Sequence, residues 1–122
     1  MYLAIGSLGF FVLAATFVIE AGDGKIAAVR VTSIHDLTLR ARAFEGAVVM
    51  TEGRLAYSEE HGEYQLIDDS PEGANYAVLI RDYDSQHLAS MLGEHVQVSG
   101  RFGYTTEDGV FIGATLVTVT ER

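Results

Sequence analysis

The chain has 122 residues, 48% of them hydrophobic, with a formal net charge of −9 and no cysteine. This length suits one compact domain, and the missing cysteines exclude disulfides, thiolate nucleophiles, zinc–thiolate sites and iron–sulfur ligation. The charge is uneven, because residues 44–122 hold four arginines against fourteen acidic side chains. Such a surface repels a phosphate backbone and favours either a basic protein partner or simple solubility.

The chain begins with a long uncharged run, from Tyr2 to Ile19. About 18 apolar residues is roughly the length that crosses a bilayer as a helix. A cleaved signal, for which Ala21 and Gly22 offer a small-residue site, and a buried helix or strand are the alternatives. No basic side chain precedes the run, so we predict a single transmembrane anchor over residues 1–20.

Basic residues follow this run and none precedes it. They are Lys25, Arg30, Arg40 and Arg42. Because basic residues near a span prefer the cytoplasmic side, they favour a single-pass membrane protein with its folded domain on the cytoplasmic face. The membrane side is otherwise undetermined by the sequence.

Residues 21–43 are expected to form a linker that contains a short strand or helix. Glycines mark Ala21–Lys25 as a connection. The β-branched stretch Ile26–Val31 reads either as a strand or as the exit from the membrane. Thr32 or Ser33 could then cap a short helix, with Asp36 as the acid three residues after Ser33.

Residues 44–122 alternate between apolar and polar positions, and turn residues divide them into five predicted strands. The expected strands are Ala47–Tyr57, Glu63–Asp68, Asn75–Arg81, Glu94–Phe102 and Val110–Val119. Gly53 predicts a bulge or a sharp bend inside the first of them. A helix is expected over Asp84–Leu92, capped by Asp84 or Ser85 and ended by Gly93.

The order strand-strand-strand-helix-strand-strand resembles the OB-fold. The pieces Val49–Leu55, Tyr64–Asp68, Gly93–Phe102 and Gly109–Ala114 are similar to those of the bacterial and archaeal OB domains grouped as tRNA-anticodon-like. The resemblance implies an all-β domain over residues 44–122. It would be a five-stranded Greek-key barrel with one capping helix, preceded by the transmembrane helix.

The whole plan, an anchor followed by an acidic OB-like domain, also looks like the haem chaperone of cytochrome c maturation. In that family a histidine near the C-terminal end of the barrel binds haem covalently, with a tyrosine four residues later. Val117–Arg122 contains neither residue. The resemblance therefore implies a similar architecture but not the haem-binding activity, and we expect no cofactor.

Tyrosines at strand ends are the best contact candidates, because an aromatic ring on a barrel face can bind a partner or stack on a base. Tyr64 and Tyr76 alternate with core positions and are expected to pack inside. The four histidines share no metal-ligand spacing, and the acidic residues lack the calcium-loop pattern. We predict no catalytic and no metal-binding residue; the predicted binding residues are Tyr57, Tyr83, Tyr104, Arg81 and Arg101.

These observations predict a membrane-anchored OB-fold binding module that acts through protein contacts and is not an enzyme. Such a module would serve as an accessory or assembly subunit of a membrane complex, with a protein partner in or at the membrane. A single-stranded nucleic-acid-binding OB protein and a haem or metal chaperone-like protein are the alternatives. The acidic charge argues against the first, and neither nucleic acid nor a small-molecule substrate is the expected partner.

Overall fold

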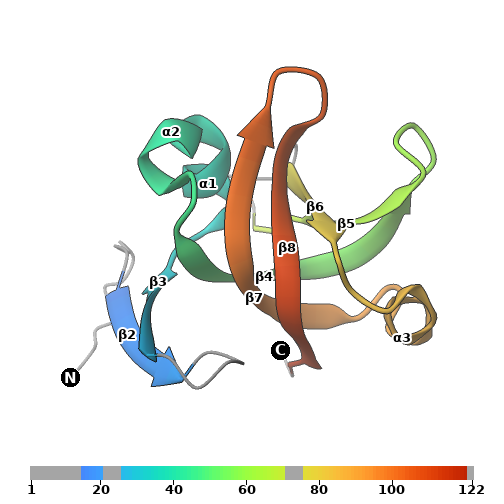
Figure 1. Ribbon diagram of the computed structural model, residues 1–122. Coiled ribbons are helices and arrows are strands. Elements are labelled where there is room, and N and C mark those ends of the chain that lie inside the picture. The colour runs from blue at the N-terminus through green and yellow to red at the C-terminus, as the bar shows by residue number, and fades with distance from the viewer. Residues whose placement is uncertain (1–14, 21–25, 71–75, 121–122) are drawn as a thin grey trace.

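The structure, a computed structural model, describes residues 15–20, 26–70 and 76–120. Strands dominate, and the helices among the described residues are short (Figure 1). The strands are β2 (Ala15–Glu20), β3 (Ile26–Val31), β4 (Val48–Ser58), β5 (Glu63–Ile67), β6 (Ala77–Arg81), β7 (His95–Thr105) and β8 (Gly109–Val119). The helices are α1 (Ile34–Leu39), α2 (Ala41–Phe44) and α3 (Ser85–Ser90).

Five strands close into a ring. β4 pairs with β5, β5 with β6, β6 with β8, β8 with β7, and β7 returns to β4. Only the pairing of β6 with β8 is parallel within this ring. From β4 to β8 the elements follow the predicted strand-strand-strand-helix-strand-strand order, which is thereby confirmed.

The long strand β4 changes partners near Gly53. Its first part, Val48–Arg54, pairs with β7, and Arg54–Ser58 pairs with β5. A Cβ atom on Gly53 would lie 2.5 Å from the carbonyl oxygen of Ile67. A bulge or a sharp bend was predicted at Gly53; β4 is curved (Figure 1), and its pairings with β5 and β7 run without a register shift. The close approach to Ile67 is the constraint on this glycine. A register shift lies instead in the β7–β8 pair, between Ser99 and Gly100.

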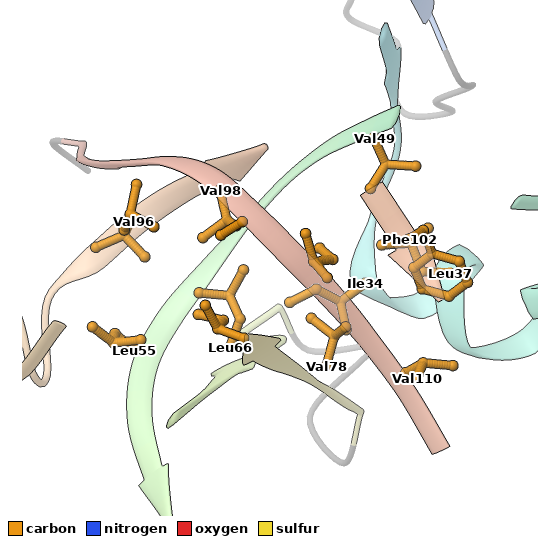
Figure 2. Packing of buried hydrophobic residues seen from close by; sticks show 14 of the residues in the cluster. Ile34, Leu37, Val49, Leu55, Leu66, Val78, Val96, Val98, Phe102 and Val110 are labelled. Carbon is orange, nitrogen blue, oxygen red and sulfur yellow. The ribbon is translucent and has the colours of Figure 1, made fainter. Parts of the chain in front are cut away.

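The hydrophobic core fills the ring, as Figure 2 shows. Alternate residues point inward along most of β4 and at the start of β7 and β8, as the predicted period of two requires, whereas three successive residues of β6 are buried. Val96 and Val98 of β7, for example, are completely buried. Each such side chain contributes about 1.5–3 kcal/mol when it leaves water. Helix α3 adds Leu88, which belongs to the same cluster.

Part of the predicted linker belongs to this folded unit. Ile34 and Leu37 of α1 lie in the core cluster (Figure 2), as does Phe44 of α2. Strand β3 pairs in parallel with the start of β4. The predicted cap of α1 is confirmed, because Ser33 Oγ accepts a hydrogen bond from the Asp36 backbone N–H at 3.0 Å. The packed unit therefore includes residues 29–43 of the predicted linker, and the short strand and short helix expected there are β3 and α1.

The helix predicted through Ile19 is also wrong where the structure describes it. Residues Ala15–Glu20 form β2, which pairs antiparallel with β3 across only a few intervening residues. Thr16, Val18 and Ile19 are β-branched and favour a strand once a partner strand lies nearby. Residues 1–14 of the predicted anchor lie outside the described residues. Within the described ranges, no helix is long and apolar enough to cross a bilayer.

Candidate functional site

An open pocket of about 540 Å³ lies on the side of the ring where α3 and the β4–β5 turn both project (Figure 1). It forms where the ends of β4 and β6 meet the start of β5 and the first turn of α3. We call it the tyrosine pocket. Its lining residues are Tyr57, Gly62, Glu63, Tyr64, Ile80, Arg81, Asp82, Tyr83, Ser85 and Leu88.

Three tyrosines give the pocket its aromatic surface. Tyr57 and Tyr64 are register partners on β4 and β5, and their rings meet edge to face at 5.1 Å. Tyr57 is 47% exposed, whereas Tyr64 packs partly against the core. Tyr83 also rests on the core, and its hydroxyl lies 3.1 Å from His87 Nδ1 on α3. Packing and hydrogen bonding thus hold the rings in place.

Arg81, at the end of β6, joins three segments of the chain. Its Nε and Nη2 atoms donate to the two carboxylate oxygens of Glu63 at 2.8 and 2.9 Å. Nη2 also donates to Asp108 Oδ2 at 2.9 Å, and the guanidinium lies 4.5 Å from the ring centre of Phe111. These residues form the Arg81 triad, Arg81 with Glu63 and Asp108. The triad carries two negative charges and one positive charge.

The triad shifts the protonation equilibria of its members. Hydrogen bonds from Arg81 lower the pKa of Glu63 below its ordinary value, against a smaller opposing effect of burial. The hydrogen bonds to Glu63 and Asp108 raise the pKa of Arg81 above its ordinary value. Arg81 is therefore a fixed cation, and three of its five N–H donors bind these two carboxylates. It positions β5, β6 and the β7–β8 turn.

A pH titration tests the Glu63 interaction. Because the pKa of Glu63 is lower in the folded chain than its ordinary 4.5, its ionised form stabilises the fold above that pH. This stabilisation is lost as the pH falls through the folded pKa. In urea titrations between pH 7 and 3, the free energy of unfolding should fall less for Glu63→Gln than for the wild type. Parallel curves would contradict the interaction.

Asp82, next to Arg81, adds a carboxylate with an unusual backbone. Its φ of 63° places it in the left-handed region, which a non-glycine residue rarely adopts and which Asp and Asn tolerate best. Its carboxylate lies against Gly113 of β8, because a Cβ atom there would be 3.0 Å from Asp82 Oδ2. The conformation turns the chain from β6 toward α3 beside the pocket.

The structure brings three of the predicted binding residues together and leaves two apart. Tyr57, Tyr83 and Arg81 line the tyrosine pocket. Tyr104 lies near the end of β7, opposite Val110 of β8. Arg101 donates through Nη1 to the carbonyl oxygen of Gly46, after α2. Neither of these two lines the pocket.

Sequence reasoning missed several lining residues. Tyr64 was assigned to the core, and it both packs on the core and lines the pocket. Apart from their charge, nothing in the sequence indicated that Glu63 and Asp82 line a pocket. Alternation along Glu63–Ile67 places Glu63 on the face opposite Leu66, and alternation along β6 places Arg81 on the face opposite Ile80. The sequence does not show that β5 and β6 pair, which is what brings Glu63 and Arg81 together.

The part of the chain that the structure describes contains no group of three or more His, Cys, Asp or Glu side chains able to hold a metal ion. His95 differs from His61 and His87, which are exposed. It is largely buried, and its Nδ1 lies 2.7 Å from Thr120 Oγ1 and 3.6 Å from a carboxylate oxygen of Glu52. This contact fastens the end of β8 to the start of β7.

Comparison with known proteins gives a fold and no family. No protein-family model matches the chain, and no curated protein matches it. Among solved structures, "OBody AM3L15 bound to hen egg-white lysozyme" is 17% identical, with a TM-score of 0.55. The match covers 75% of this chain and 94% of that one. The structure "OBody AM1L10 bound to hen egg-white lysozyme" is 19% identical with a TM-score of 0.49, covering 66% and 84%. OBodies are built on the OB-fold, so this β-rich chain has an OB-like fold.

Proposed function

We propose that this chain is a binding module that acts through protein contacts, with the tyrosine pocket as its contact site. The observation that carries the proposal is an open pocket with three tyrosines on a rigid sheet ring. Tyrosine is enriched at protein interfaces because its ring is large and its hydroxyl tolerates water. Tyr57 is almost half exposed, so a partner can reach this surface.

The proposal includes a finer description of the fold. The ring of β4 to β8 is read as the five-stranded Greek-key barrel of an OB-fold, and α3 as its capping helix. Support comes from the closed strand pairing and from Leu88 and Met91, which bury the α3 region in the core. The fold alone specifies no ligand, because OB-like domains serve many functions.

Attachment to a membrane is a further part of the proposal. Its support is the uncharged sequence from Tyr2, of which Ala15–Glu20 are a strand and the preceding residues lie outside the described ranges. Fractionation of the full chain tests it. The wild type should remain with membranes after an alkaline wash, whereas Leu8→Arg should reduce that fraction, because a charge is costly inside a bilayer. Equal release of both chains would contradict the attachment.

Co-purification tests the protein partner. The full chain, tagged at its C-terminus and expressed at native abundance, is extracted in mild detergent and isolated. A stoichiometric partner should accompany the wild type and Tyr104→Ala, and Tyr57→Ala should lose it. Tyr104 is the matched comparison because it is a tyrosine that is 38% exposed and lies outside the pocket. A clean monomer in every preparation would overturn the proposal.

A single-stranded nucleic-acid binder is the second candidate, favoured by the exposed Tyr57 and Tyr104 on an OB-like ring. The net charge opposes it, since affinity for nucleic acid comes largely from cations that release counterions. We expect no salt-dependent shift of a labelled oligothymidylate by the full chain below high micromolar concentration. A shift at low micromolar concentration that weakens with added salt would reverse this ranking.

A further inference from the structure

We infer that the tyrosine pocket accepts a basic side chain, arginine or lysine, from a segment of the protein partner. The inference rests on the proposed function and specifies the chemistry of its contact site. Three features of the pocket lead to it: its local charge, its aromatic surface and its rigidity.

The local charge favours a cation. Among the lining residues the one cationic side chain is Arg81, and its donors already bind the carboxylates of Glu63 and Asp108. The Arg81 triad therefore has a net charge of −1. Asp82 also lines the pocket, with its carboxylate against Gly113 of β8, and adds a second negative charge. An anionic ligand would meet two uncompensated charges of its own sign, whereas a cation would be attracted by them.

The aromatic surface provides faces for that cation. A guanidinium or ammonium group is attracted to the face of an aromatic ring within about 6 Å of its centre. Among the described residues this contact occurs between Arg81 and Phe111 and between Arg30 and Phe44, both at 4.5 Å. Tyr57 meets Tyr64 edge to face, so the edge of one ring covers one face of the other and the remaining faces of this pair are not stacked on each other. One face of Tyr83 stacks on His87, with 5.6 Å between the ring centres. Tyrosine faces and carboxylates together distinguish a basic side chain from an uncharged one.

Hydrogen bonds within the chain also hold several residues of the pocket and of the adjacent turn in position. The β4–β5 turn is held by a hydrogen bond from the Gly62 backbone N–H to the Ser58 carbonyl oxygen at 2.8 Å. Ser58 Oγ lies 3.1 Å from His61 Nδ1 in the same turn. Tyr83 is held by His87, and Glu63 by two hydrogen bonds from Arg81. Little ordering remains for a ligand to impose, which favours recognition of a single side chain.

Peptide binding tests this inference with the full chain in mild detergent. The ligands are penta-arginine and penta-citrulline, which share nearly the same shape but differ in charge. Binding is followed by the NMR signals of the tyrosine rings and the backbone amides. Penta-arginine should shift the signals of Tyr57, Tyr64 and Tyr83. Penta-citrulline should bind about tenfold more weakly or not at all, because it lacks the cation.

Single substitutions locate the interaction. Asp82→Asn removes a charge and keeps a residue that tolerates the left-handed backbone. It should weaken penta-arginine binding about threefold or more, and Tyr57→Ala should do the same. Tyr57→Phe keeps the aromatic face and should bind like the wild type. The control is Glu45→Gln, which removes one exposed negative charge after α2, outside the pocket.

The outcomes separate this inference from the proposed function. Equal binding of both peptides, equal weakening by Asp82→Asn and Glu45→Gln, or stronger binding of an oligonucleotide would overturn the inference. If a partner co-purifies but penta-arginine shifts no pocket signal, the inference fails and the binding module stands. If penta-arginine binds in the pocket but no partner co-purifies, the cation site stands and the proposed function fails.

Discussion

Replacing Gly100 with alanine is expected to lower the free energy of unfolding by about 3 kcal/mol. Gly100 lies in β7 between Val49 of β4 and Ala114 of β8, where the ring closes. A Cβ atom there would overlap the carbonyl oxygen of Gly113 and come within 2.8 Å of the Ala114 Cα. Both obstacles are backbone atoms of a paired strand, so relief requires the two strands to separate. Urea titration followed by circular dichroism measures the loss.

Gly93→Ala is the matched control. Gly93 has a φ of 88° and no atom within 4 Å of an added Cβ. Its substitution tests the backbone conformation alone and should cost about 1 kcal/mol. If Gly100→Ala is no more destabilising than Gly93→Ala, the close approach of β7 and β8 does not limit stability.

Replacing Arg81 with methionine should be the second large effect, a loss of about 2 kcal/mol in the free energy of unfolding. Methionine can still pack on Phe111, so the change mainly removes the hydrogen bonds to Glu63 and Asp108. It also leaves two carboxylates that shared one guanidinium without a cation between them. The same urea titrations at pH 7 provide the measurement.

Two further variants assign this loss to the triad. Arg81→Lys keeps the charge but not the bidentate hydrogen bonding to Glu63, so we expect an intermediate loss in the free energy of unfolding. In the double variant of Arg81→Met with Glu63→Gln, the losses should not add, with an interaction of about 1 kcal/mol. Additive losses, or an Arg81→Met variant as stable as the wild type, would show that the triad is a surface contact of little energetic weight.

The strands of the ring were predictable because alternation and turn residues are local signals. Val96 and Val98, for instance, mark the inward face of β7 without any knowledge of its neighbours. Likewise, Ser33 and Asp84 were identified as possible helix caps and do accept hydrogen bonds from backbone N–H groups two or three residues later. Such features depend on a few neighbouring residues, so a sequence can reveal them.

The errors concern features that depend on distant partners. The run before Glu20 is apolar throughout, and hydrophobicity alone cannot distinguish a membrane helix from a strand that pairs with β3. Residues 29–43 read as part of a linker with a short strand or helix, because their partners lie in β4 and the core. The pocket combines residues from β4, β5, β6 and α3, and Arg81 binds carboxylates 18 and 27 positions away. No local pattern contains such pairings.

The pairing of β4 with both β3 and β5 also has a consequence for self-association. β3 and β5 lie along successive parts of this strand, β3 beside Val48–Met50 and β5 beside Arg54–Ser58. Unpaired N–H and C=O groups on a strand edge can recruit a second chain. Until β3 docks, the first part of β4 presents such groups beside the buried Val49. The β2–β3 hairpin covers this part of β4 and moves the open edge of the sheet to β2.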